Sequence, residues 1–214
     1  MIIVIEILLF TITSFAVGLS GALVPGPMLT VTISDSLKKG FIAGPLIVLG
    51  HFIAELSLIL LIFGGLGFLI GSSTSAFIIG TLGGFVMVLM GYRIVYSSNS
   101  LKEIKEENEI SKRYGPVLSG FLTSVANPFF FIWWATIGWA FIFKGLELAG
   151  FFGVLAFIIG HWTSDLGWFS LVSFFTSRGS HVMTEKHYKI MMNASGVFLM
   201  ILGVYFLLNA QKIV

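Results

Sequence analysis

Two histidine–carboxylate pairs with the same spacing stand out in an otherwise apolar chain. His51 precedes Glu55 by four residues, and His161 precedes Asp165 by four residues. Residues four positions apart lie on one face of an α-helix, so each pair can hydrogen-bond internally or project into one cavity. Ionisable groups inside a membrane are costly and usually face the interior of a helix bundle or a water path. The pattern therefore predicts a buried site on two membrane helices.

Side chains of these types support several kinds of chemistry. A carboxylate in a low-dielectric site can take up and release a proton in each transport cycle. The same carboxylate can hold the ammonium group of a cationic substrate. Two imidazoles and two carboxylates together can ligate a divalent metal ion. A structural interpretation also stands, because a histidine and an acid one turn apart can simply fix helix packing.

Two helix-breaking motifs interrupt the apolar runs. The first is Pro25, Gly26 and Pro27, and the second is Asn127 with Pro128. Proline removes a backbone donor and clashes with the preceding helical turn, so both motifs break helices. Broken helices at corresponding positions of two halves indicate the substrate site of a secondary transporter. We therefore expect these five residues to line a substrate path, the alternative being that the first motif only ends a helix at the membrane surface.

The elements that position these motifs must be membrane helices. Of the 214 residues, 57% are hydrophobic and only 10% are charged, and the mean hydropathy is +1.00. A soluble domain carries about 25% charged residues, so the composition excludes a soluble enzyme, a nucleic-acid-binding domain and a disordered chain. The net charge of +2 requires no nucleic-acid partner. We predict an all-α polytopic membrane protein surrounded by lipid.

Six apolar segments are each long enough for a transmembrane helix, which needs about 20 residues. They are residues 3–24, 41–66, 74–96, 117–142, 150–176 and 190–211. Residues 97–116 are strongly polar, and we expect a solvated cytoplasmic linker there, with a short surface helix as the alternative. The chain 1–214 is thus predicted to be a single transporter domain whose two parts cover about 1–96 and 117–214.

The two parts resemble each other in sequence. Residues 50–56 (GHFIAEL) match residues 160–166 (GHWTSDL), and residues 84–91 (GFVMVLMG) match residues 196–203 (GVFLMILG). With three spans in each part, the second part must enter the membrane upside down relative to the first. We therefore predict six transmembrane helices built as a 3+3 inverted-topology repeat, a plan that secondary transporters use for alternating access.

Basic residues are divided unevenly between the two sides of this topology. Cytoplasmic loops carry an excess of Lys and Arg, so loops 1, 3 and 5 are predicted to be cytoplasmic and both termini to lie outside a cell membrane. The basic residues of these loops are Lys38, Lys39, Arg93, Lys102, Lys105, Lys112, Arg113, Arg178, Lys186 and Lys189, whereas the opposite side has Lys144 and Lys212.

Aromatic residues follow the second helix break closely. We expect them to pack or to face lipid rather than to form a binding cage, because membrane helices carry many aromatic side chains near the interfaces. They are Phe129, Phe130, Phe131, Trp133, Trp134 and Trp139.

With the two helix breaks and the two histidine–acid helices, the chain resembles the LysE family of amino-acid exporters, the lysine exporter and homoserine/threonine resistance group. The resemblance covers nearly the whole chain, and its most specific elements are the Pro-Gly-Pro and Asn-Pro motifs. It implies export of amino acids or related small metabolites, driven by protons or the membrane potential, and a homodimer. Glu55 lies where many members carry an intramembrane aspartate. After the Asn-Pro motif many relatives carry a polar residue, whereas this chain continues with Phe129, Phe130 and Phe131, which favours a neutral or hydrophobic amino acid over lysine.

The sequence thus predicts a secondary-active exporter rather than an enzyme, with no cofactor and no resident metal. No G-x-x-x-x-G-K-[ST] phosphate loop is present in the sequence, so the chain itself is not expected to hydrolyse ATP. Three alternatives stay open: a divalent-metal exporter that uses His51, Glu55, His161 and Asp165, an intramembrane hydrolase with a zinc-activated water, and a passive scaffold.

Overall fold

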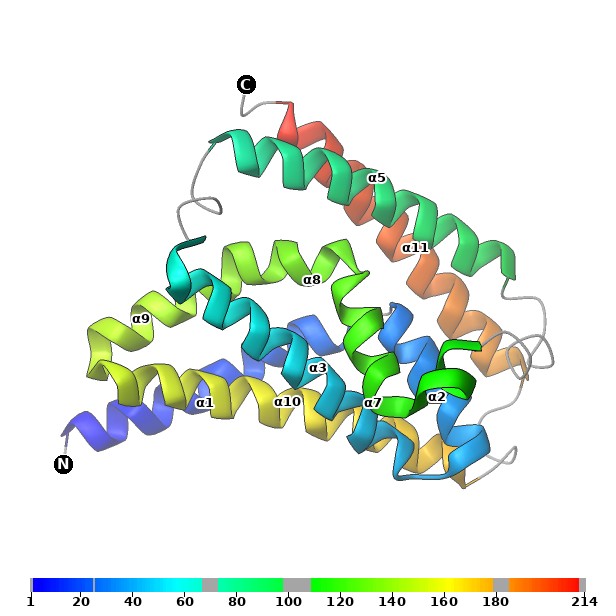
Figure 1. Cartoon of the computed structure of the whole chain (residues 1–214), viewed down its shortest axis with the longest axis horizontal. Helices are drawn as coiled ribbons and strands as arrows, with labels where there is room; N and C mark the ends of the chain where they lie inside the picture. Colours follow the sequence, from blue (N-terminus) through cyan, green and yellow to red (C-terminus); the bar gives the residue numbers. More distant parts are fainter. Residues whose placement is uncertain (1, 25, 67–72, 98–108, 179–184, 212–214) are drawn as a thin grey trace.

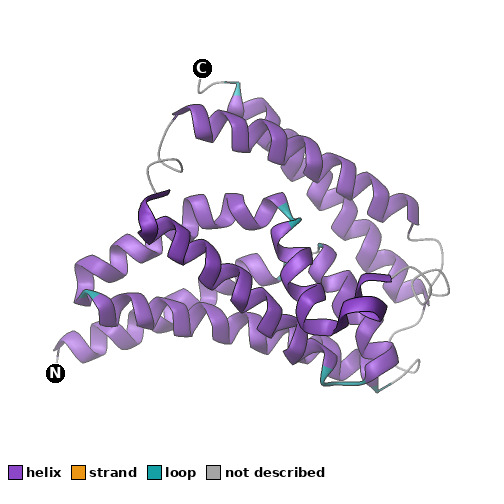
Figure 2. Ribbon diagram, viewed as in Figure 1, coloured by secondary structure: helices purple, strands orange, loops and turns teal. Residues whose placement is uncertain are grey.

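The computed structural model describes residues 2–24, 26–66, 73–97, 109–178 and 185–211, which are almost entirely helical and contain no β-strand (Figures 1 and 2). The α-helices are α1 (Ile2–Ala22), α2 (Pro27–Lys39), α3 (Ala43–Leu61), α5 (Ser73–Ser97), α7 (Glu109–Val125), α8 (Pro128–Trp133), α9 (Trp139–Ala149), α10 (Phe151–Ser177) and α11 (Glu185–Ala210). A π-helical turn, η1 (Ile62–Leu66), extends α3, and a second one, η2 (Trp134–Gly138), joins α8 to α9.

Five of the six expected segments are confirmed as helices to within a few residues, namely those of α1, α3 with η1, α5, α10 and α11. The fourth, residues 117–142, is wrong as a single helix. It divides at Asn127 into α7 and a longer helical run from α8 to α9. The reason is local, because Pro128 has no backbone donor for the preceding turn and Asn127 caps a new helix that starts there.

A second difference concerns residues 27–39, which were expected to be loop and form helix α2. Pro27 occupies the first position of this helix, where its missing donor is harmless, and Gly40 ends it with a φ of 78°. In the expected polar linker, residues 109–114 are helical as far as Gly115, whose φ is 80°. These six residues are therefore helical, as the alternative of a short helix supposed, and residues 98–108 lie outside the described part of the chain.

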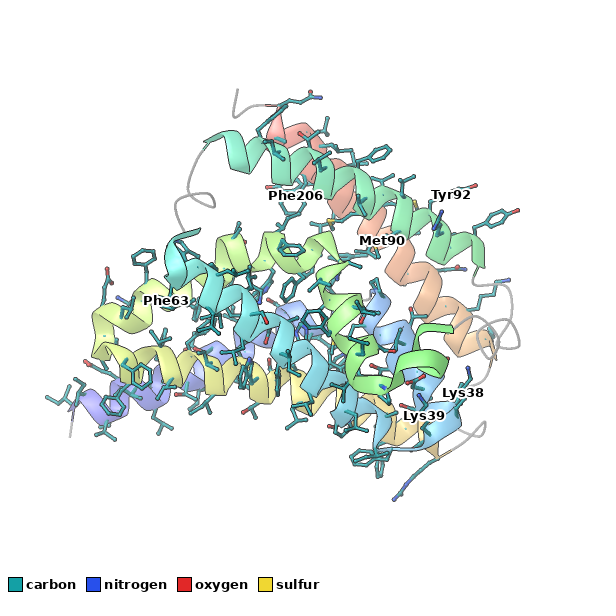
Figure 3. The ribbon with its side chains drawn as sticks, viewed as in Figure 1. Lys38, Lys39, Phe63, Met90, Tyr92 and Phe206 are labelled. Carbon is teal, nitrogen blue, oxygen red and sulfur yellow. The ribbon has the colours of Figure 1, made fainter. Side chains whose placement is uncertain are left out.

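The helices suit a membrane in length and in the distribution of polarity. Three helices are long and apolar enough to cross one by themselves: Ile2–Ala22, Ala43–Gly64 and Phe129–Ala149. Large apolar side chains cover the outside, as Phe63 does in Figure 3 with 54% of its surface exposed. Polar side chains such as Ser14 and Ser119 are fully buried. This distribution of polarity is the reverse of that in a soluble protein. It fits a lipid environment, because lipid offers polar groups no hydrogen-bond partners outside the bundle.

Glycines allow several pairs of the described helices to approach closely. A Cβ atom at Gly50 on α3 would overlap the backbone of Val117 on α7, and a Cβ atom at Gly160 on α10 would overlap the carbonyl oxygen of Thr11 on α1. Small residues drive such packing in membranes, where lipid is as apolar as the side chains it competes with. The α5–α11 pair shares a contact made by Gly84, Gly91, Gly196 and Gly203. Figure 1 shows this pair crossing one side of the bundle, where α5 contacts α8.

The α10 glycines provide a test of this packing. We expect Gly160→Ala to lower the free energy of unfolding by about 1–3 kcal/mol, because the new methyl group must push apart two backbones. Gly167→Ala on the same helix is the matched control, since a Cβ atom there meets nothing within 4 Å. Thermal unfolding of both variants in detergent measures the difference. Equal stability of the two variants would contradict the close α1–α10 contact.

Candidate functional site

The two helix breaks lie next to each other inside the bundle. Gly26 is the extended residue that precedes α2, and Asn127 precedes α8, where its Oδ1 accepts a hydrogen bond from the backbone N–H of Phe129 at 3.1 Å. A Cβ atom at Gly26 would lie 3.7 Å from Asn127 Nδ2, so the two breaks meet. Pro25 lies outside the described residues. Pro128 is the first residue of α8, and its side chain is not among those that the structure describes.

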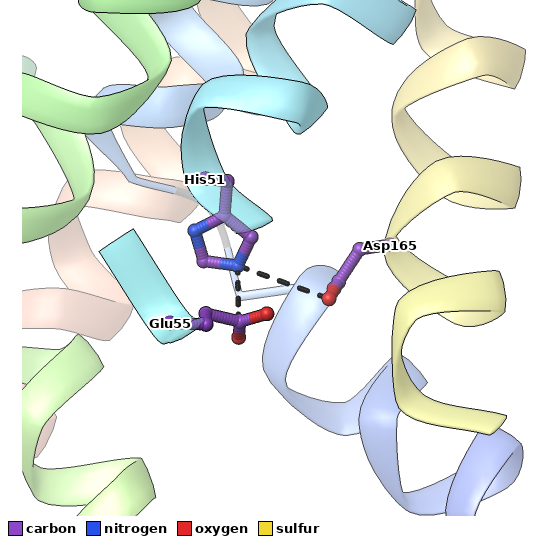
Figure 4. A group of neighbouring side chains, drawn as sticks. All are labelled: His51, Glu55 and Asp165. Atoms are coloured by element: carbon purple, nitrogen blue, oxygen red, sulfur yellow. Dashed lines mark ion pairs between the residues drawn. The ribbon is translucent and has the colours of Figure 1, made fainter. Parts of the chain in front are cut away.

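The four ionisable residues converge at the middle of α3 and α10. His161 Nε2 lies 2.7 Å from Glu55 Oε1 and 3.4 Å from Asp165 Oδ2. His51 Nε2 lies 3.2 Å from the same Glu55 oxygen and 3.8 Å from Asp165 Oδ2. Figure 4 shows His51, Glu55 and Asp165 pointing toward one another from the two helices. The two pairs that were expected from their spacing therefore form one site, which we call the His–acid cluster.

The His–acid cluster is buried and its hydrogen bonds are incomplete. The side chains of Glu55, Asp165 and His161 are 1%, 3% and 4% exposed, whereas His51 retains 13%. Glu55 Oε1 also accepts a hydrogen bond from the indole N–H of Trp134 at 3.1 Å. Glu55 Oε2, by contrast, has no hydrogen-bond partner among the described residues. Asp165 Oδ2 likewise has none there, so two carboxylate oxygens are left without a hydrogen-bond donor in a buried site.

The hydrogen-bond pattern indicates where protons lie in the cluster. Ser124 has one hydroxyl hydrogen, which it donates to the carbonyl oxygen of Gly120 at 2.7 Å. The Ser124 oxygen must therefore accept the 2.7 Å hydrogen bond that joins it to His51 Nδ1. The hydrogen of that bond is then on His51 Nδ1. If His51 is neutral, its Nε2 then presents a lone pair to oxygens of Glu55 and Asp165. At least one further proton or another cation is needed between these atoms to offset their repulsion.

Aromatic rings enclose the histidine of α10. The ring of His161 stacks on Trp133 with centroids 4.6 Å apart and on Phe157 at 5.8 Å, while Trp134 meets it edge-on at 5.6 Å. Trp133 and Trp134 therefore pack in the interior, in line with the expectation that the aromatic residues after Asn127 pack or face lipid, and they do so beside the cluster. Stacked rings hold an imidazole in one orientation and exclude water from it.

A cavity of about 70 Å³ lies where the helix breaks meet the His–acid cluster. Six of the sequence-predicted residues line it: Gly26, His51, Glu55, Asn127, His161 and Asp165. Pro27 starts α2 without being among the lining residues. The aromatic part of the wall consists of Phe129, Phe130, Trp133, Trp134 and Phe169. The space is polar on one side and aromatic on the other, which suits a small molecule with a charged group and an apolar part.

Two residues of the site were missed by the sequence analysis. Ser124 orients His51, and Trp134 donates to Glu55. The only sequence signal for Ser124 is its position three residues before the Asn127 break. Trp134 gives no separate signal, because the surrounding aromatic run hides it. Chemically, the completed site can hold a proton or an ammonium group. The ligand atoms of His51, Glu55 and Asp165 also lie within 4.8 Å of one another, which is close enough for them to bind a divalent metal ion.

Comparison with known proteins agrees with this architecture. The chain is 25% identical over 195 residues to the Bacillus subtilis (strain 168) protein named "Putative amino acid efflux protein YcgF", an alignment that covers 88% of this chain and 90% of that protein. No solved structure matches the chain. The family described as LysE type translocator matches residues 19–210, which include both helix breaks and the whole His–acid cluster. The chain therefore belongs to the LysE type translocator family, a family of transmembrane exporters.

Proposed function

We propose that the protein is a secondary-active exporter that moves amino acids or related small metabolites out of the cytoplasm by alternating access. The observation that carries this proposal is the cavity that both helix breaks share with the His–acid cluster. A substrate in this cavity would contact unpaired backbone at the breaks and ionisable groups at once, as in other transporters with broken helices. Membership of a translocator family favours this transport over the zinc-hydrolase and scaffold alternatives.

Reciprocal contacts support the 3+3 inverted repeat in this proposal. The sequence match makes Gly84 equivalent to Gly196 and Gly91 equivalent to Gly203. A Cβ atom at Gly84 would lie 2.7 Å from the carbonyl oxygen of Gly203, and one at Gly196 would lie 2.5 Å from that of Gly91. Exchanging equivalent residues turns the first contact into the second, as a two-fold axis would. The α3–α7 and α1–α10 contacts are related in the same way.

The His–acid cluster is the proposed coupling site. The bond from His51 Nδ1 to Ser124 leaves Nε2 facing the two carboxylates, with room for an exchangeable proton between them. A substrate ammonium group could replace that proton, and this exchange would couple transport to a proton gradient. If the loaded cluster carries a net charge, transport would instead be coupled to the membrane potential. The aromatic wall favours a neutral or hydrophobic amino acid. The homodimer that the family resemblance implies belongs to the same proposal.

The coupling role predicts the behaviour of two amide variants. We expect Glu55→Gln and Asp165→Asn each to abolish counterflow driven by a pH gradient, because an amide cannot exchange the proton. Proteoliposomes with a panel of labelled amino acids, with and without the gradient, provide the measurement. Glu147→Gln is the control, since it removes a carboxylate that is 70% exposed on α9. Full gradient-driven activity in both cluster variants would remove the coupling role.

The proposed orientation in the cell membrane predicts which residues face the outside. Lys38 and Lys39 mark one end of the bundle in Figure 3, and Lys144 belongs to the opposite side in the predicted topology. The chain has no cysteine, so single cysteines can be introduced without background labelling. We expect an impermeant maleimide to label Lys144→Cys in intact cells and Lys38→Cys only after permeabilisation. The reverse pattern would invert the topology.

Export of a divalent metal ion is a second candidate function, which the convergence of His51, Glu55 and Asp165 favours. It predicts that zinc or manganese enters liposomes loaded with a fluorescent chelator. Glu55→Gln should abolish this flux, whereas Glu147→Gln should leave it unchanged. Under the amino-acid proposal, wild-type liposomes take up no more metal than empty ones. Metal flux without exchange of any amino acid, in folded protein, would replace the first function by the second.

A further inference from the structure

Helix α2 is polar and yet almost completely buried. Thr32, Ser34, Asp35 and Ser36 are each at most 1% exposed. Each buried polar group needs a hydrogen-bond partner to offset its loss of solvation, whereas an apolar helix would seal the same space without that requirement. The α8–α9 side of the cavity is sealed in that way, by a cluster of aromatic and aliphatic side chains. The polar composition of α2 therefore calls for another explanation than packing.

Helix α2 separates the cavity from the end of the bundle that carries basic residues. Met28 and Leu29 in its first turn line the cavity. Lys38 and Lys39 in its last turn are exposed at that end (Figure 3). Its 13 residues span about 20 Å, and the helix packs between α3, α7 and α10. Helix α2 thus lies between the cavity and this face.

Three hydroxyl groups of α2 are near carbonyl oxygens one turn earlier. Thr30 donates to the carbonyl oxygen of Gly26 at 3.3 Å, Thr32 to that of Met28 at 2.8 Å, and Ser36 Oγ lies 2.5 Å from that of Thr32. Bonds of this kind, from a hydroxyl to a carbonyl one turn earlier, stay intact when the helix moves as a rigid body. A displacement of α2 would therefore leave these three carbonyl acceptors within reach.

Both ends of α2 permit such a displacement. Gly26 precedes it in an extended conformation without a side-chain cap, and Gly40 follows it with a φ of 78° and no neighbour within 4 Å of a Cβ position. Only the φ of Gly40 favours glycine, since any residue adopts the extended conformation of Gly26. The ion pair between Asp35 and Lys39, at 3.1 Å, also lies within the helix. These features describe a helix with a glycine at each end and a sharp turn at Gly40.

A serine pair joins α2 to α10. The hydroxyl oxygens of Ser36 and Ser173 lie 2.7 Å apart, the Ser173 oxygen lies 2.6 Å from the carbonyl oxygen of Phe41, and the N–H of Gly44 donates to Ser173 at 3.2 Å. The two hydroxyls have two hydrogens, so one serine donates to the other while the second donates to its carbonyl, that of Thr32 for Ser36 or of Phe41 for Ser173; after the pair separates, each donates to its own carbonyl. Breaking the serine pair therefore orphans neither residue.

We propose that α2 is the gate between the cavity and the basic end of the bundle, and that the Ser36–Ser173 contact is its latch. The inference rests on the proposed transport function. In the closed arrangement the serine pair holds α2 against α10. When α2 pivots about Gly26 and Gly40, Thr32 and Ser36 line a polar route to the cavity, with Ser173 facing them. The buried hydroxyls of α2 are thus the walls of a path that opens transiently.

A reversible cross-link tests the gate. In a chain without cysteine, Ser36→Cys and Ser173→Cys combined should form a disulfide under mild oxidation, because the two side chains are in contact. We expect oxidation of this double variant to abolish amino-acid counterflow in proteoliposomes and reduction to restore it. Each single variant should be insensitive to the oxidant. Full counterflow in the cross-linked protein, or failure of the cross-link to form, would overturn the gate.

A labelling experiment covers the case in which the double variant does not fold. Ser36→Cys alone should react with a water-soluble maleimide, and faster when the transported amino acid is added. Ser14→Cys is the matched control, since Ser14 is equally buried and bonds to its own helix, α1, in the fixed part of the bundle. Equal protection of both cysteines under all conditions would overturn the gate. Absence of counterflow in the wild-type protein would instead count against the proposed function.

Discussion

Two carboxylates and two imidazoles buried between α3 and α10 must satisfy one another, and much of the structure follows from that requirement. Lipid offers them no partners, and removal of one member would leave an uncompensated charge, which costs several kcal/mol. The two helices must therefore stay in register, with Glu55 opposite His161 and His51 opposite Asp165. The glycine contacts to α1 and α7 hold this pair of helices in place.

The spacing of residues allowed part of the site to be predicted. A separation of four residues places His51 with Glu55 on one helix face, whatever the tertiary structure. The Asn127 break was also predictable, because the chemistry of Asn-Pro acts within a few residues. The approach of the two histidine–acid pairs to each other could not be predicted, because it depends on the register in which α3 and α10 pack. Ser124 and Trp134 were missed for the same reason, since each contacts the site across a helix boundary.

Helix α2 shows a different limit of sequence interpretation. Its residues are too polar to be recognised as a membrane helix, and a hydropathy pattern assigns them to a loop. The structure buries them because helices on several sides surround α2 and because Thr32 and Ser36 bond to their own backbone. The aromatic run after Asn127 was expected either to pack or to face lipid, and the sequence did not decide between the two. Its apolar character suits lipid and a protein interior equally, and only the tertiary structure distinguishes the two.

The symmetry of the cluster and the asymmetry of its surroundings have different consequences. If the repeats are equivalent, the His–acid cluster presents the same groups to both faces, so it favours neither direction of movement. The elements beside it differ, because α2 is polar whereas the run from α8 through η2 to α9 carries Trp133, Trp134 and other aromatic side chains. A polar wall hydrates when it opens, but an aromatic wall opens only around an apolar group. The preference for substrates with an apolar part would then arise at the aromatic side, while the cluster recognises the charged group that such substrates share.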